Sequence, residues 1–189
     1  MNNRPSSSNI PRLRRDETVL IVVDVQQKLV PAMFEAERVV RNVALLARAA
    51  KLLQIPTIVT EQNPQKLGET VESLHRVLDV FAPIPKMCFS ACVEETMQQL
   101  RATNRSNVVL CGLETHVCIL QSALDLLENG WTVWLPQDAT SSRYENDKRA
   151  GIERMKSAGA ISTSVESATY EMLGEAGTDE FRALLPFLK

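Results

Sequence analysis

The sequence predicts one α/β domain, a doubly wound sheet of about six parallel strands with helices on both faces. Two observations lead to this prediction. Short and nearly continuous apolar runs are typical of strands that are buried on both faces of a sheet. Segments with helical periodicity separate these runs, and this alternation is the pattern of parallel strands joined by crossover helices. A chain of 189 residues is long enough to form one substantial core.

In the first half of the chain, Thr18–Val23 is predicted to be a strand because it is almost entirely apolar. Arg38–Leu53 is predicted to be a helix, since its apolar residues fall on one stripe at helical spacing. A polar loop over residues 61–70 contains Pro64 and Gly68, which both favour turns. The other elements are expected in chain order as a strand at Pro56–Thr60, a short helix at Val71–Leu78, a strand at Ile84–Met87 and a helix at Val93–Arg101.

In the second half, the apolar run Asn107–Cys111 predicts a fourth strand. The following helix, Cys118–Asn129, is expected to stop at Gly130, a residue that commonly ends helices. Further elements are expected as a strand at Trp131–Leu135, a helix at Asn146–Ser157, a strand at Ala160–Thr163 and two helices at Val165–Leu173 and Asp179–Phe187. The sequence shows no internal repeat and no second domain.

The composition and the net charge limit the kinds of molecule that the protein is expected to bind. Hydrophobic residues make up 44% of the chain and charged residues 23%, which is typical of a folded globular protein. The net charge of −2 gives no reason to expect nucleic acid or an anionic membrane surface. No apolar run approaches the length of a membrane span. We therefore expect a small-molecule substrate, with no nucleic acid and no membrane as partners.

The four cysteines have no paired CxxC spacing, and the chain contains only two histidines. Neither pattern is that of a zinc-ligand cluster, so we predict no metal site and no cofactor. Free thiols suit a reducing compartment, which indicates the cytoplasm.

Residues 1–15 carry four arginines, two prolines and a run of three serines, with no acidic residue. We interpret this segment as a disordered arm and residues 16–189 as the folded domain. An organelle transit peptide is the alternative, because such leaders are rich in Arg and Ser and poor in acidic residues. The prolines disfavour the amphipathic helix that a transit peptide forms.

Three reactive side chains follow predicted strands directly. Asp24 follows the first strand, Lys86 lies at the end of the third, and Cys118 follows the fourth. Each has an ordinary structural explanation, as a loop or cap residue, a solvated charge and a core thiol respectively. Because ligands bind at the carboxyl ends of parallel strands, their shared location predicts an active site.

Cys118 is also expected near the N-terminus of a helix, where unpaired backbone N–H groups favour negative charge. A thiol in that position ionises more easily than a free thiol, and the thiolate is the nucleophilic form. The sequence therefore predicts a thiol with a lowered pKa.

These residues resemble the isochorismatase-like cysteine hydrolases, and the likeness covers nearly the whole chain from Thr18 onward. The matching positions are Asp24 with Gln26, Lys86 with Phe89 and Ser90, and the turn Gly112–Cys118. Other motifs resemble the isochorismatase domain-containing subfamily: Glu61-Gln62-Asn63-Pro64 with Leu67-Gly68, Cys111–Thr115, Asp125-Leu126-Leu127 and Ala139–Arg143. The resemblance implies a Rossmann-like sheet, and members of the family are often homo-oligomers.

The resemblance also implies a Cys–Asp–Lys triad. Asp24 would take the thiol proton, Cys118 would attack a carbonyl carbon, and Lys86 would lie near both. In the family, the peptide bond that matches Leu113–Glu114 is cis. The backbone N–H groups of Glu114 and Cys118 would then form an oxyanion hole.

Two departures from related enzymes refine this expectation. Relatives that hydrolyse nicotinamide carry an Asp and two His as a metal site, whereas the corresponding stretch here contains Glu61, Gln62 and His75. Relatives that cleave the vinyl ether of isochorismate have glycine at the position of Cys118. The thiol therefore points to a small amide, ureide or related acyl substrate.

Loop positions suggest which residues contact the substrate: Gln26, Gln62, Phe89 and Arg143. Arg143 has two open interpretations, because its guanidinium could grip a substrate carboxylate or pair with a carboxylate of a neighbouring loop. The function also has an alternative: a non-catalytic scaffold or thiol-based sensor could keep the fold and the reactive cysteine without turnover.

Overall fold

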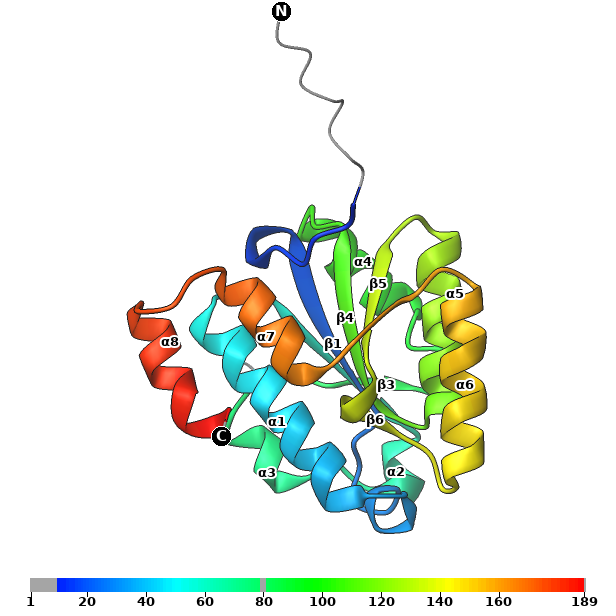
Figure 1. Cartoon of the computed structure of the whole chain (residues 1–189). Helices are drawn as coiled ribbons and strands as arrows, with labels where there is room; N and C mark the ends of the chain where they lie inside the picture. The colour runs from blue at the N-terminus through cyan, green and yellow to red at the C-terminus, as the bar shows by residue number, and fades with distance from the viewer. Residues whose placement is uncertain (1–9, 79–80, 189) are drawn as a thin grey trace, which may run out of the picture.

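The computed structural model describes residues 10–78 and 81–188. It contains a parallel sheet of seven strands in the order β3-β2-β1-β4-β5-β7, and β6 pairs with the end of β4 (Figure 1). The strands are β1 (Thr18–Val23), β2 (Thr57–Gln62), β3 (Ile84–Lys86), β4 (Asn107–Leu113), β5 (Thr132–Pro136), β6 (Thr140–Ser141) and β7 (Ile161–Thr163). The predicted fold class is confirmed.

Helices cover both faces of the sheet (Figure 1). The first face carries α1 (Ala36–Leu52), α3 (Glu72–His75), α7 (Val165–Leu173) and α8 (Asp179–Leu184). The second face carries α4 (Glu94–Ala102), α5 (Leu120–Glu128) and α6 (Glu145–Ser157). A short helix, α2 (Pro64–Leu67), lies in the loop after β2.

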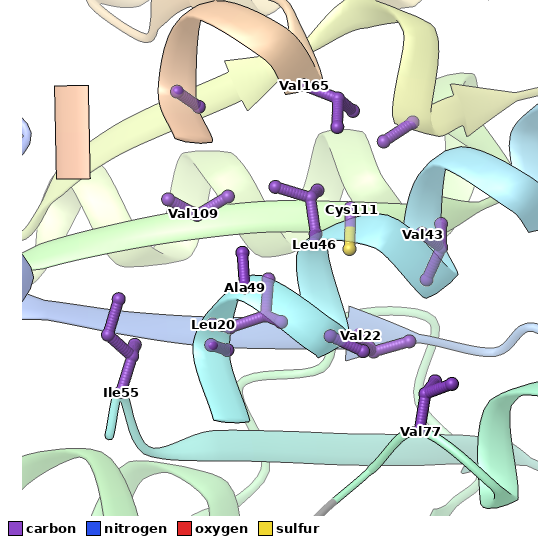
Figure 2. Packing of buried hydrophobic residues seen from close by; sticks show 14 of the residues in the cluster. Leu20, Val22, Val43, Leu46, Ala49, Ile55, Val77, Val109, Cys111 and Val165 are labelled. Atoms are coloured by element: carbon purple, nitrogen blue, oxygen red, sulfur yellow. The ribbon is translucent and has the colours of Figure 1, made fainter. Parts of the chain in front are cut away.

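The strands separate two apolar clusters because successive side chains point to opposite faces. In β1, Leu20 and Val22 pack under α1, whereas Val19 and Ile21 pack against the helices of the other face. Figure 2 shows the first cluster, in which Leu46 lies between the α1 helix and the sheet near Val109 and Cys111. All six residues of β1 are buried, which explains the continuous apolar run in the sequence.

Several local features differ from the expectations, three of them near the carboxyl ends of the strands. The predicted second strand stops at Thr60, but β2 continues to Gln62 and therefore carries more of the site. The two-residue strand β6 was not predicted, since two residues have no measurable periodicity. The helix expected from Cys118 begins earlier, with a π-helical turn at Thr115–Ile119 that leads into α5.

The N-terminal arm is described in part. Residues 1–9 lie outside the described residues, but Leu13 is fully buried and its backbone N–H donates to Glu171 Oε1 at 3.1 Å. The segment just before residue 16 therefore packs against the domain. Within the described residues, no helix is long and apolar enough to cross a membrane.

Candidate active site

The site lies where the strand order changes direction. The chain passes from β1 to β2 on one side and reaches β4 on the other side, so the carboxyl ends of β1 and β4 flank a switch point. Val23 is paired with Gly112, and a Cβ on Gly112 would lie only 2.0 Å from the Val23 carbonyl oxygen. Glycine thus lets the two strand ends approach closely, which brings Asp24 and the turn after β4 together.

Asp24 and Lys86 form a buried ion pair. Lys86 Nζ donates to Asp24 Oδ2 at 2.6 Å, and both side chains are completely inaccessible to solvent. The Thr60 hydroxyl donates to the other carboxylate oxygen, Oδ1, at 2.9 Å. Burial raises the pKa of the Asp24 carboxyl, and Lys86, Thr60 and Cys118 oppose this shift. A carboxylate with a raised pKa is a better proton acceptor.

Lys86 is held by oxygens on several sides. Besides Asp24, its Nζ donates to the side chain of Gln62 at 2.8 Å and to the carbonyl oxygens of Cys88 and Phe89 at 3.2 and 3.0 Å. An ammonium group has three protons, so these neighbours replace the water that burial removes. The interactions also tie the loop after β3 to the cation.

Cys118 completes the group and is only 5% exposed. Its thiol lies near the Asp24 carboxylate and the backbone of Glu114, and both affect its pKa. Burial raises the pKa of this thiol to about 12, the charge of Asp24 adds to the increase, and Lys86 opposes it. The structure thus brings together all three predicted triad residues.

The expected lowering of the Cys118 pKa is wrong for the resting site. The helix N-terminus was expected to favour the thiolate, but the loss of solvent and the adjacent Asp24 carboxylate outweigh it. The sulfur is therefore protonated at neutral pH. Asp24, which lies beside the thiol, is the carboxylate placed to accept its proton.

The turn before Cys118 has an unusual backbone. The Leu113–Glu114 peptide bond is cis. The carbonyl oxygen of Glu114 then accepts hydrogen bonds from the N–H groups of Val117 and Ile119, both at 3.1 Å, which forms the widened π turn. Glu114 therefore lies at the start of the turn that carries Cys118, and its backbone lowers the pKa of the thiol.

Gln26 does not face a substrate. Its side chain is fully buried, and its amide nitrogen donates to the carbonyl oxygens of Gln62 and Gly68 at 3.0 and 2.6 Å. Its amide oxygen accepts from the backbone N–H of Gln62 at 2.8 Å. The side chain instead fastens the loop after β2, whose backbone also pairs with residues 25–28.

Gln62 is likewise occupied within the protein. Its amide oxygen accepts from Lys86, and its amide nitrogen donates to the carbonyl oxygen of Met87 at 2.9 Å. The side chain therefore positions the ammonium group and the start of the next loop. Phe89, in contrast, has an exposed side chain on the same loop, so it remains available to a ligand.

Arg143 adopts the second of its two predicted arrangements. Its Nε donates to Glu114 Oε1 at 2.9 Å, and the arginine side chain is largely exposed. The partner, Glu114, is the residue at the start of the turn that carries Cys118. Arg143 thus contacts the turn of the nucleophile through Glu114 and lies at the rim of the site.

Other candidate residues have structural positions. His116 Nδ1 lies 2.9 Å from the Ser142 hydroxyl. Cys111 is buried in the core, and burial raises the pKa of Cys92 to about 11. No group of three or more His, Cys, Asp or Glu side chains suited to a metal ion occurs among the residues that the structure describes. Sequence reasoning missed Thr60 and Ser122, whose hydroxyls are typical of any strand or helix.

The raised pKa predicts how Cys118 reacts with iodoacetamide. At pH 8 the exposed Cys88 should be labelled well before Cys118, and the Cys118 rate should rise about tenfold per pH unit up to pH 10. Asp24→Asn should accelerate labelling of Cys118, because it removes the carboxylate that disfavours the thiolate. Peptide mass spectrometry over time measures both sites, and equal rates at pH 8 would contradict the assigned environment.

The family follows from comparison with known proteins. The Isochorismatase domain matches residues 18–167 of the chain. The chain belongs to the isochorismatase family. It is 35% identical over 178 residues to isochorismatase domain-containing protein 2 of Xenopus laevis, covering 94% of this chain and 86% of that protein. Both the superfamily and the subfamily predicted from the sequence are confirmed.

Solved structures of the isochorismatase fold agree. A Caenorhabditis elegans protein described as MAR1 ribonuclease is 36% identical, with a TM-score of 0.89 over 94% of this chain and 92% of that chain. The YcaC gene product of Escherichia coli, described as an octameric hydrolase of unknown specificity, is 24% identical. Its TM-score is 0.88 over 96% of this chain and 91% of that chain, which shows the shared fold.

Proposed function

We propose that this isochorismatase-family protein hydrolyses the C–N bond of a small amide, ureide or related acyl compound, with Cys118 as nucleophile. One observation carries the proposal. The Cys118 thiol lies beside a buried carboxylate, Asp24, whose two oxygens accept hydrogen bonds from Thr60 and Lys86. A thiol, a base and a fixed cation in contact are the components of nucleophilic acyl transfer.

The first step couples proton transfer to attack. As the sulfur bonds to the carbonyl carbon, its proton passes to the Asp24 carboxylate, and the carbonyl electron pair moves to oxygen. The negative charge thus leaves Asp24 and appears on the oxyanion, while Lys86 remains positive nearby. The backbone N–H of Glu114, in the turn that carries Cys118, can donate to that oxyanion.

The second step breaks the C–N bond. The protonated Asp24 returns its proton to the leaving nitrogen, which departs as an amine or ammonia and leaves a thioester on Cys118. Water then attacks the thioester carbon with Asp24 again as the base, and Cys118 recovers its proton. One carboxyl group therefore serves as base and acid in turn, which suits its raised pKa.

The alternative of a thiol sensor has less support. Sensor cysteines are exposed and ionised, because the thiolate reacts with oxidants. Cys118 is nearly inaccessible, and its pKa is raised to about 12. A ribonuclease activity, the description of the C. elegans structure, is also less favoured here because the chain carries a net charge of −2.

The direct test is a substrate screen. Purified protein is incubated with a panel of small amides, ureides and carbamoyl compounds, and with single-stranded RNA, and product formation is followed by mass spectrometry. Cys118→Ala serves as the inactive control and Cys88→Ser as the matched control for an exposed thiol. Amide hydrolysis that Cys118→Ala abolishes supports the proposal. Turnover that persists in Cys118→Ala, or RNA cleavage alone, would refute it.

Arg143 gives a prediction about substrate charge. If the substrate carries a carboxylate, the guanidinium can bind it with two parallel hydrogen bonds after release from Glu114. Arg143→Ala should then raise KM by about 10- to 100-fold, equivalent to about 1.5–3 kcal/mol for a hydrogen bond to a charged group. Steady-state kinetics on acidic and neutral substrates measures this, and an unchanged KM would leave Arg143 as a surface ion pair.

We also propose a homo-oligomer. Met87 and Phe89 lie on the loop after Lys86 and are 71% and 54% exposed, so two large apolar side chains on one loop are open to a partner. The octameric E. coli neighbour is consistent with assembly in this fold. Light scattering after size-exclusion chromatography would give the mass directly, and a monomer at micromolar concentration would refute the proposal.

A further inference from the structure

We infer that Ser122 is a positioning residue. It fixes the turn that contains Cys118 relative to the loop that follows Lys86. Ser122 lies in α5, one turn after the nucleophile, and is fully buried. Its hydroxyl donates to the carbonyl oxygen of Cys118 at 2.6 Å and accepts from the backbone N–H of Ala91 at 2.7 Å. The inference rests on the proposed role of Cys118 as nucleophile.

The first of these bonds is common and the second is not. Serine in a helix often donates to the carbonyl four residues earlier, which by itself has no functional meaning. Here the same hydroxyl is also the acceptor for a backbone N–H from a loop 31 residues away in sequence. Ala91 is itself buried, so that N–H would lose its hydrogen bond if the hydroxyl were absent.

Ser122 and Lys86 both form hydrogen bonds with the backbone of the same loop, the one after β3. Two residues before Ala91, the Phe89 carbonyl accepts from Lys86 Nζ, and the Cys88 carbonyl does the same. Lys86 binds Asp24, and Asp24 lies beside the Cys118 thiol. The contacts form a closed ring, in which Ser122 links the backbone of the nucleophile to the loop that anchors the cation.

A closed ring constrains the distance from Lys86 to the sulfur. The ammonium favours the thiolate, so its position affects the reactivity of Cys118. Without the Ser122 hydroxyl, the loop is free to move, and with it two of the four oxygens that hold Nζ. The cation then shifts away from the sulfur, and the thiolate becomes less favourable.

The test uses thiol alkylation, because this measurement needs no substrate. In Ser122→Ala, labelling of Cys118 by iodoacetamide at pH 9 should be about tenfold slower than in the wild type, which corresponds to one pKa unit. Ser122→Cys keeps a longer and weaker donor and should show a smaller decrease. Thr169→Val is the matched control, since Thr169 is equally buried and its hydroxyl donates to Val165 four residues earlier, at 2.7 Å. It should label at the wild-type rate.

A second comparison shows whether Ser122 acts through Lys86. In a Lys86→Met background, Ser122→Ala should change the Cys118 rate by less than about twofold, because the cation is already absent. A full tenfold effect in that background, or an unchanged or faster rate in Ser122→Ala alone, would overturn the inference. If Lys86→Met and Asp24→Asn also leave the rate unchanged, the proposed catalytic group itself is wrong, so the two failures are distinguishable. Circular dichroism confirms that each variant is folded at the assay temperature.

Discussion

Replacement of Cys118 by serine should lower the turnover rate constant by at least about 10³-fold while the protein remains folded. The substitution exchanges one atom in a side chain that is almost fully enclosed. A serine hydroxyl is far less acidic than a thiol. Enzymes with a serine nucleophile commonly use a histidine as the base, whereas the base here is the Asp24 carboxylate. The attack would therefore start from a much less favourable proton transfer.

The measurement is the rate constant on the best substrate found in the screen, with thermal unfolding followed in parallel. The unfolding temperature of Cys118→Ser should stay close to the wild-type value, because the fold around the turn is set by the backbone and by Gly112. Cys88→Ser controls for thiol replacement and should keep full activity. A Cys118→Ser rate within tenfold of the wild type would rule out covalent catalysis at this position.

The sequence predicted the sheet well where burial on both faces imposes a continuous apolar run. Thr18–Val23 was placed to the residue, and Asn107–Cys111 was short by the two residues that β4 adds at its carboxyl end. Those two, Gly112 and Leu113, lie where β4 pairs with the unpredicted β6. Pairing partners are tertiary information, so a local pattern could not reveal the extension.

The candidate site was predicted by strand ends and by resemblance, but its electrostatics were not. Cys118 was placed correctly after β4, yet the direction of its pKa shift was wrong. A pKa depends on solvent exclusion and on charges from other strands, and sequence spacing reports neither. The same limit applies to Gln26 and Gln62, whose amides were predicted to face a ligand and instead bind backbone groups and Lys86.

Replacement of Lys86 by methionine should destabilise the protein by about 3–5 kcal/mol near neutral pH, because it leaves the Asp24 carboxylate buried without a cation. For a chain of this size the melting temperature should fall by about 6–20 °C. Asp24→Asn combined with Lys86→Met should recover much of the loss, since no buried charge remains. Lys156→Met is the control: its exposed ion pair with Glu153 should contribute less than about 1 kcal/mol.

The pH dependence gives this prediction a sign. Burial already raises the pKa of Asp24 above its ordinary value, and loss of Lys86 raises it further. A carboxyl group whose pKa is higher in the folded state than in the unfolded state is least costly when protonated, below the unfolded pKa of about 4. The stability difference between wild type and Lys86→Met should therefore be small near pH 4 and should increase as pH rises toward 7. Urea unfolding at a series of pH values measures this difference. A stability difference that does not change with pH would show that the methionine acts through packing and that Lys86 does not stabilise the Asp24 carboxylate.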